Sequence, residues 1–414
     1  MRITFKNVAL SIAAIATLSS CSKEYGCTDP TADNYDESAD EDCCCYYAPP
    51  VTSNTVVTSD ITEDTQWTNN NIYELSGRIA VEAGATLTIQ EGTIIKGQAG
   101  SGPNASALLV ARNAKLIAEG TPDQPIIFTS IADQITQTDI ASGNFASPNL
   151  DPSLNGFWGG LIILGNAPIS ASADEVAIEG IPTTDPNGLY GGSDPIDMAG
   201  ESVVRYVSIR HGGSNIGNGN EINGLSLGGV GTATTIDHVE IVANQDDGVE
   251  FFGGTVDATN IVVWNNGDDA IDTDQSWNGT LDNFVIVTPK GHCFELDGPE
   301  GASALGHTIR NGNVYASVDE DDTSEDLINT DDNSIVDFEN ILITDIIAGQ
   351  IINRVTHGVG VVNFSNVLLD IPSGVITDYI PDGETLPAGI SEGNTGQADE
   401  SVFGWTWASQ AGAF

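Results

Sequence analysis

The chain has 414 residues with 12 basic and 59 acidic side chains, which gives a formal net charge of −47 at pH 7. Nucleic acids and anionic lipid surfaces bind through Lys and Arg, so this balance disfavours both as partners. An acidic surface also keeps a protein soluble without any partner. The 46 glycines suit a fold with many turns, and short apolar runs typical of strands outnumber helical patterns.

Residues 1–20 have the pattern of an export signal. Arg2 and Lys6 precede an apolar run at residues 8–18 that is too short for a permanent membrane span. Leu18-Ser19-Ser20-Cys21 follows and resembles the lipobox of bacterial lipoproteins. This resemblance implies that Cys21 becomes the mature N-terminus and carries lipid such as palmitate. It predicts a protein anchored in the lipid of the outer membrane and displayed at the cell surface.

Residues 21–54 are predicted to be a flexible, lipid-anchored acidic tether. They resemble a short Cys-bounded acidic module of surface proteins from Gram-negative bacteria. An oxidising compartment favours disulfides, and Cys27 is expected to pair with one of Cys43, Cys44 and Cys45. The alternative to a solvated spacer is a Ca²⁺ site, since carboxylate oxygens suit that ion. Its candidate ligands are Asp33, Asp36, Asp40 and Asp42.

From residue 55 onward, brief strands alternate with Gly corners. Leu87-Thr88-Ile89, Leu108-Leu109-Val110 and Ile126-Ile127-Phe128 are typical. They resemble the opening coils of right-handed parallel β-helices of the pectin-lyase-like group. The resemblance predicts an all-β fold for residues 55–414, a single-stranded right-handed parallel β-helix (a solenoid) with long loops. Residues 131–200 supply the longest loops, which either build a binding wall or are mere insertions.

The end of the chain carries Gly404-Trp405-Thr406-Trp407. These aromatic residues are expected to cover the last coil of the solenoid. The alternative is that they are exposed and stack on sugars.

A short repeat in residues 239–297 dominates the chain. Asp247, Asp269 and His292 follow one another at steps of 22 and 23 residues, a period typical of one solenoid coil. Alternation directs the apolar column of Val249, Ile271 and Phe294 inward. The flanking columns are expected to point outward and consist of Asp247, Asp269 and His292, and of Glu250, Asp272 and Glu295. Carboxylates about 4.8 Å apart repel one another and raise one another's pKa. A cation, hydrogen bonds or a function that needs a shifted pKa must offset that cost.

The repeat resembles the active-site rows of polygalacturonases, which hydrolyse pectin with inversion. On that resemblance the catalytic residues are Asp247, Asp268, Asp269 and His292. Asp269 is then the general acid, Asp247 and Asp268 hold the water, and His292 tunes them. Cys293 stands where the family has Gly, and no Lys follows Arg310. A galacturonate carboxylate would go unbound, so a glycoside hydrolase here needs a non-pectin substrate.

The preferred interpretation is a non-catalytic surface protein that binds a glycan or other surface ligand. The binding residues are then Asp246, Glu250, Asp272 and Glu295, with Trp264 and Trp277 stacking on sugar rings. Stacked acids can also hold Ca²⁺, or they can be structural corners that hydrogen-bond local backbone. Docking on an outer-membrane transporter is a third alternative.

Overall fold

The computed structural model describes residues 25–30, 32, 35, 37–42, 45, 54–102, 105–214, 222–319, 322–353 and 360–414. The chain divides into two compact units, Met1–Tyr47 and Ala48–Phe414. The expected signal peptide and the lipidated Cys21 lie outside the described residues. None of the helices in the described ranges is long and apolar enough to cross a bilayer.

In the first unit, a small sheet and one disulfide hold the described residues. Strand β1 (Tyr25–Gly26) pairs in parallel with β2 (Glu41–Asp42). Cys27 is bonded to Cys45, the last of its three candidate partners. Of the expected Ca²⁺ ligands, Asp33, Asp36 and the side chain of Asp42 lie outside the described residues. The proposed site in this unit therefore stays a prediction.

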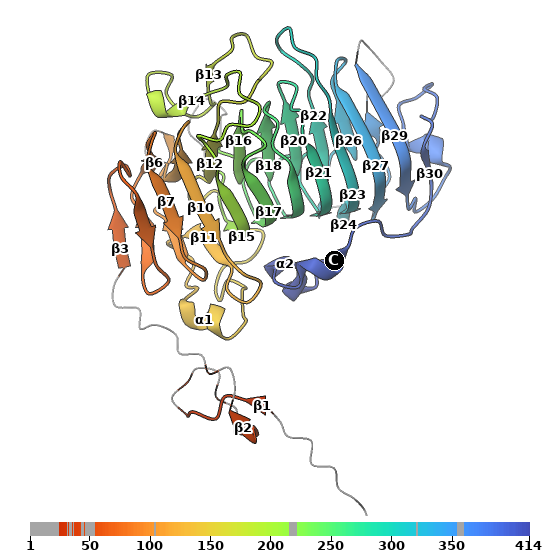
Figure 1. Cartoon of the computed structure of the whole chain (residues 1–414). Coiled ribbons are helices and arrows are strands. Elements are labelled where there is room, and N and C mark those ends of the chain that lie inside the picture. Colours follow the sequence, from red (N-terminus) through yellow and green to blue (C-terminus); the bar gives the residue numbers. More distant parts are fainter. Residues whose placement is uncertain are drawn as a thin grey trace, which may run out of the picture. The chain divides into compact units, whose positions relative to one another are not determined.

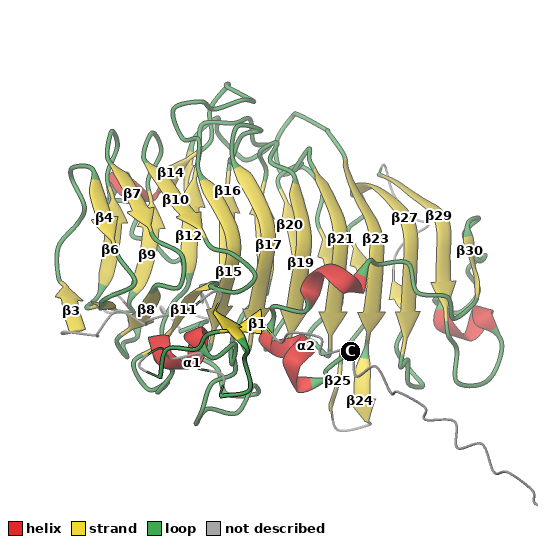
Figure 2. Ribbon diagram, turned by 60° about the horizontal axis from the view of Figure 1, so that its bottom comes forward, coloured by secondary structure: helices red, strands yellow, loops and turns green. Residues whose placement is uncertain are grey.

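The second unit consists of two long sheets whose strands pair in parallel (Figure 1, Figure 2). The path of the larger sheet is β3 (Asn54–Val57), β5 (Ile72–Leu75), β8 (Ile94–Gly97), β11 (Ile126–Ser130), β15 (Val203–Arg210), β17 (Thr235–Val242), β19 (Ala258–Trp264), β21 (Thr280–Val287), β23 (His307–Tyr315), β27 (Ile335–Thr344), β29 (Val361–Leu369) and β30 (Ile390–Glu392). A branch that joins it at β15 is made of β4 (Thr65–Trp67), β7 (Thr86–Ile89) and β10 (Lys115–Glu119).

The second sheet contains, in order, β6 (Arg78–Val81), β9 (Ala107–Val110), β12 (Leu161–Leu164), β16 (Leu225–Gly228), β18 (Val249–Phe252), β20 (Ile271–Asp274), β22 (Phe294–Leu296), β26 (Ile328–Thr330) and β28 (Ile352–Asn353). Short hairpins outside the two sheets are β13 (Val176–Ala177) with β14 (Leu189–Tyr190), and β24 (Ser317–Asp319) with β25 (Asp322–Thr323). The helices are α1 (Gln137–Ala141), α2 (Trp407–Ala411) and the 3₁₀ turns η2 (Pro186–Gly188), η3 (Ile376–Tyr379) and η4 (Glu400–Phe403).

The chain crosses from one sheet to the other and back once per coil, so consecutive strands of each sheet come from consecutive coils. Strand β17, for example, leads to β18, and β19 then pairs with β17 while β20 pairs with β18. This is a parallel β-helix, and the predicted right-handed β-helix fold is confirmed. Each coil supplies the hydrogen-bonding edge for the next, so only the terminal coils leave open edges.

The core lies between the sheets and is built from in-register columns of apolar side chains. Val249, Ile271 and Phe294 are neighbours in adjacent strands and are at most 1% exposed, as the repeat predicts. Leu225 and Leu161 extend the column toward the N-terminus. The period of two along each strand therefore decides which side chains enter the core.

One corner of the helix is made by residues with left-handed backbone in the middle of the long strands. In β15 the residues before Tyr206 pair with β10 and those after it pair with β11, so the strand bends at this residue. The equivalent residues of later coils are His238, Asn260, Asn283, Asn311, Asn340 and Asn366, with φ between 53° and 60°. Asn tolerates this conformation better than most residues do.

The side-chain amides of these corner residues also bond from coil to coil. Asn283 Nδ2 donates to Asn260 Oδ1 at 2.7 Å, and Asn366 Nδ2 donates to Asn340 Oδ1 at 3.0 Å. A ladder of amides thus tightens the corner along the axis of the helix.

The long loop of residues 165–200 covers the N-terminal part of the second sheet. Ile178, Ile181 and Tyr190 of this loop form an apolar cluster with outward side chains such as Ile162 and Leu164. The outward face of the sheet is therefore apolar where the loop lies on it. The loop thus covers the sheet here, and the expected role of the loops in binding stays a prediction.

The C-terminal residues were expected to cover the last coil, and this prediction is wrong. They fold back over the middle of the larger sheet. Phe403, Trp407 and Ala408 pack on outward apolar side chains of β17, β19 and β21, such as Val262 and Val285. The larger sheet carries apolar residues on both faces there, which require a cover. Helix α2 accordingly lies beside the middle strands in both views (Figure 1, Figure 2).

A buried ion pair fixes this C-terminal segment. Arg210 and Glu240 are 1% and 0% exposed, with Nη2 and Oε2 3.6 Å apart. Glu240 Oε1 accepts the backbone N–H of Ala408 at 2.9 Å, and the Arg210 guanidinium lies 5.0 Å from the ring centre of Trp407. Ser208 bridges the pair by accepting from Arg210 Nε and donating to Glu240 Oε2.

Candidate functional site

The predicted ladder lies on the second sheet, on strands β18, β20 and β22. Glu250, Asp272 and Glu295 are direct neighbours in register, as the repeat requires. The same column continues to Asn329 on β26 and begins with Ser226 on β16. This column points away from the core, and its members come from separate coils.

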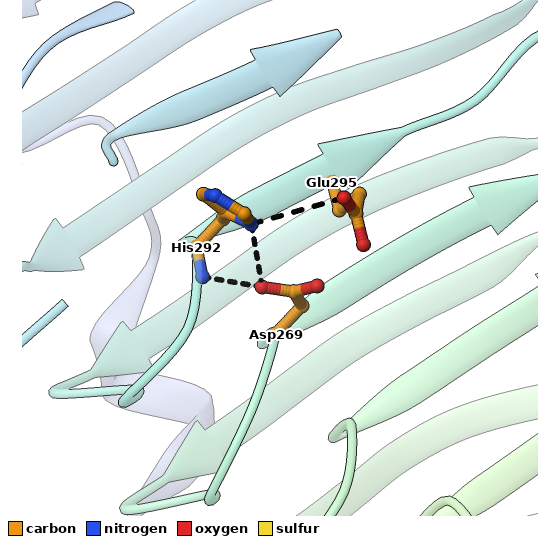
Figure 3. A group of neighbouring side chains, drawn as sticks. All are labelled: Asp269, His292 and Glu295. Carbon is orange, nitrogen blue, oxygen red and sulfur yellow. Dashed lines mark hydrogen bonds and ion pairs between the residues drawn. The ribbon is translucent and has the colours of Figure 1, made fainter. Parts of the chain in front are cut away.

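The second predicted column lies in the turns just before these strands. Asp247 Oδ1 accepts the backbone N–H of Asp269 at 3.0 Å, and Asp269 Oδ1 accepts the backbone N–H of His292. Each carboxylate therefore satisfies a donor of the next coil. His292 Nδ1 lies 2.9 Å from Asp269 Oδ1 and 3.9 Å from Glu295 Oε1, so both columns converge on this imidazole (Figure 3).

Both columns were expected to be exposed, and three of their members are not. Asp247, Asp269 and Glu250 are 7%, 4% and 6% exposed. Asp247 and Asp269 turn toward backbone donors, and Glu250 accepts from Asn223 Nδ2. The accessible part of the face consists of the exposed Asp268 and the partly exposed Asp246, Asp272, His292 and Glu295.

The two tryptophans do not form a sugar platform. Trp264 is 8% exposed and packs edge-on against Trp407 of the C-terminal segment. Trp277 is 1% exposed, stacks on Phe251 in the core and donates its indole N–H to Val256 O at 3.0 Å. Stacking on a sugar needs an accessible ring face, so the expected role of both residues is wrong.

The side chains of Asp269, His292 and Glu295 shift one another's pKa values in different directions. Burial raises the pKa of Asp269, but the interactions with His292 and Glu295 outweigh it and leave the pKa below its ordinary value. Burial lowers the pKa of His292, but Asp269 and Glu295 outweigh it and raise the pKa to about 9. Burial, and then the neighbouring Asp269, raise the pKa of Glu295 to about 8. At neutral pH, Asp269 is therefore a carboxylate, His292 carries a positive charge and Glu295 is mainly protonated.

Three further carboxyls of the face retain protons at neutral pH. Burial, and then mutual repulsion, raise the pKa of Asp247, Glu250 and Asp272 well above the ordinary range. Burial and the nearby Glu300 raise the pKa of Asp274 to about 7. The expected assignment of Asp269 as general acid does not fit these values, because Asp269 is ionised at neutral pH. Asp247 is buried and protonated, which does not fit a residue that holds the water.

Several polar residues beside the ladder were missed from sequence. Asn329 Nδ2 lies 3.1 Å from His292 Nε2, and Glu325 Oε2 lies 3.8 Å from the same atom. The coil that carries them is lengthened by the β24–β25 hairpin, so the short repeat ends before it. The one available signal was the strand-like Ile328-Asn329-Thr330, which continues the column of Glu295.

Within the described ranges, three groups of side chains bring potential metal ligands within 4.8 Å of one another. They are Asp269 with His292 and Glu295, Asp246 with Asp247 and Asp268, and Asp247 with Glu250 and Asp272. The first combines an imidazole with two carboxylates, whereas the other two contain only acids. The first therefore has a donor set that differs from the all-oxygen sets that suit Ca²⁺.

Comparison with known proteins supports the fold and adds no closer relative. Neither the curated proteins nor the solved structures contain a significant match to the chain. A family model described as a pectate-lyase-like β-helix domain matches residues 59–371, most of the second unit. Since this match covers well over half of the sequence and the strands wind as a parallel solenoid, the chain belongs to the pectate-lyase-like β-helix family.

Proposed function

We propose that the protein is a lipid-anchored protein of the outer membrane that binds a glycan on the outward face of β18, β20 and β22 without cleaving it. The observation that carries this proposal is the in-register pair of partly exposed carboxyls, Asp272 and Glu295, beside the exposed Asp268. Carboxyl groups accept hydrogen bonds from sugar hydroxyls, and protonated ones also donate. A polysaccharide aligned with the axis of the helix meets one such group per coil.

The charge of this face limits the ligand. Asp246, Asp268, Asp272, Glu295 and Glu325 bring only negative charge or neutral acid to the accessible area. Positive charge nearby comes from His292, with which Asp269 already pairs, and from the exposed Lys290 in the turn before β22, so the acids outnumber the bases on this face. A neutral glycan or an amino sugar therefore fits, and a uronate is repelled.

The burial of the expected catalytic pair supports binding over inverting hydrolysis. Asp247 and Asp269 are 7% and 4% exposed, and each accepts a backbone N–H of the next coil. An inverting hydrolase needs two carboxyls that a water and the substrate can reach. The catalytic arrangement that the polygalacturonase resemblance implies is therefore not supported by the positions of these two residues.

The test is a glycan-binding panel with the mature chain. Wild type should bind neutral or amino-sugar polysaccharides, and Asp272→Asn with Glu295→Gln should weaken binding at least tenfold. Glu392→Gln is the matched control, because it removes an exposed carboxylate from β30 of the other sheet. Equal binding by the ladder variants and the control, or no binding across the panel, contradicts the proposal.

The membrane anchor is tested separately. Cys21→Ser should release the protein from the outer-membrane fraction. If the Cys21→Ser variant stays in the membrane fraction, the proposed lipid anchor is wrong, and the proposal of glycan binding is not affected.

A second function, hydrolysis of a non-pectin polysaccharide, is favoured by one observation. Glu295, with a pKa of about 8, stands beside the ionised Asp269, and enzymes obtain an acid and a base by separating two carboxyl pKa values in this way. New reducing ends released by wild type and lost in Glu295→Gln would establish it. Their absence across the same panel leaves binding alone.

A further inference from the structure

His292 has an unusual environment for a surface histidine. Its Nδ1 is buried and has no hydrogen-bond partner, although Asp269 Oδ1 is 2.9 Å away and Glu295 Oε1 is 3.9 Å away. Figure 3 shows the nitrogen between the two carboxylates, which are its ion-pair partners. A histidine that served only as an ion-pair partner would align its N–H with one oxygen.

The other ring nitrogen is held from the opposite side. Nε2 lies 3.1 Å from the side-chain amide of Asn329. The oxygen and nitrogen of an amide have nearly the same shape, so the amide can present its oxygen to this ring. When a cation displaces the second proton of the imidazole, Nε2 keeps its proton and Nδ1 directs a lone pair at the carboxylates. Metal-bound histidines are oriented in this way by an acceptor on their outer nitrogen.

The spacing of the three groups fits a small ion between them. Ligand atoms about 2.0–2.2 Å from Zn²⁺ lie roughly 3.2–3.6 Å from one another when the coordination is tetrahedral. The two distances from Nδ1 bracket that range, and all three ligand atoms lie within 4.8 Å.

From this geometry we infer that Asp269, His292 and Glu295 form a binding site for a divalent transition-metal ion of the Zn²⁺ type. Two carboxylates balance the charge of one such ion, and imidazole suits transition metals better than Ca²⁺. Glu295 is 35% exposed at its side chain, so an ion could reach the three groups from solvent. The site goes beyond the proposed glycan binding and does not depend on it.

The experiment titrates the metal-free mature chain with Zn²⁺ in a calorimeter. Wild type should bind one ion, and loss of a ligand in His292→Ala or Asp269→Asn should weaken binding by about 100-fold or more, since even outer-shell changes cost 10–100-fold. Co²⁺ in place of Zn²⁺ should give visible absorption that these variants lose. X-ray absorption should show one imidazole nitrogen and otherwise oxygen ligands.

Two variants act as controls for the site. His238 also pairs with a carboxylate, since its Nδ1 lies 2.7 Å from Asp237 Oδ1, and it is 14% exposed compared with 15% for His292. Thr259 and Asn260 already donate to that carboxylate oxygen, so His238→Ala should leave Zn²⁺ binding unchanged. Cys293→Ser should also leave it unchanged, because the thiol is buried and contacts Ser324.

Several results would overturn the inference. Zn²⁺ binding that survives His292→Ala, or that Ca²⁺ displaces at equal concentration, contradicts it, and so does the absence of any binding by wild type. Circular dichroism checks that each variant folds. If His292→Ala does not fold, Glu295→Gln changes only a partly exposed group and should still lose at least tenfold in affinity. If the protein binds Zn²⁺ but no glycan, the proposed glycan-binding function is wrong and the inferred metal site stands.

Discussion

Replacement of Glu240 by Gln should destabilise the β-helix far more than the same change on the surface. Arg210 and Glu240 are both almost completely buried, and Gln keeps the size of the side chain and an oxygen for the Ala408 N–H. The substitution thus removes the charge and little else. The guanidinium of Arg210 is left buried without a counterion.

The expected loss is about 3–5 kcal/mol in the free energy of unfolding, the usual cost of breaking a buried ion pair from one side. Glu119→Gln is the matched control. Glu119 pairs with Arg205 at 3.0 Å, but these side chains are 55% and 37% exposed. An exposed pair contributes about 0–1 kcal/mol.

Urea unfolding followed by circular dichroism measures both variants. Hydrogen exchange at the Ala408 amide should also accelerate in Glu240→Gln, because the C-terminal segment is held there. If the two variants lose the same free energy within about 0.5 kcal/mol, the buried pair does not hold this segment and the argument fails.

Asn283→Ala should lower the free energy of unfolding by about 1 kcal/mol more than Asn283→Gly does. Both variants lose the hydrogen bond to Asn260, but only Ala is strained at φ 60°. Equal losses of free energy in urea unfolding would contradict a conformational role of Asn283. The metal-free fold should lose stability as pH rises from about 5 to about 9, because folding raises the pKa of Glu295 from 4.5 to about 8 and of His292 from 6.5 to about 9. Both side chains bind protons more tightly in the folded state than in the unfolded state. A thermal midpoint that increases from about pH 5 to about pH 9 would therefore contradict the predicted direction of the pH dependence. Reduction of the Cys27–Cys45 bond should leave the unfolding midpoint of the β-helix unchanged, because both cysteines belong to the separate first unit.

The repeat around Asp247, Asp269 and His292 was enough to predict a solenoid, because its period is set by local turns and by one coil of backbone. The resemblance of the opening strands to pectin-lyase-like coils supplied the right-handed β-helix. The same period placed Val249, Ile271 and Phe294 in one buried column, and it aligned Glu250 with Asp272 and Glu295. These features depend on spacing along the chain, which is visible in the sequence.

The burial of Asp247, Asp269 and Glu250 was not predictable in the same way. It depends on where side chains turn and on what lies above them, and Asn223 precedes Glu250 by 27 residues. Trp264 and Trp277 were misassigned for a similar reason. The alternation of apolar and polar residues along a strand does not predict that the C-terminal segment covers Trp264. It also does not predict that the indole of Trp277 packs in the core.

The asparagine corner was detectable and was not recognised. Asn260, Asn283, Asn311, Asn340 and Asn366 each follow a polar residue inside an apolar strand, which marks a bend where the backbone becomes left-handed. Their spacing varies because the coils differ in length. Spacing alone therefore does not identify them as one column.

The amide ladder at this corner also determines how such a protein can change length during evolution. Asn340 donates to Asn311 of the coil before it and accepts from Asn366 of the coil after it, so it links both neighbours. Duplication of an entire turn inserts another link that joins both neighbours. Loss or gain of a single residue within a strand would instead exchange the inside and outside of that turn. Growth by complete turns is thus the change that this architecture accepts.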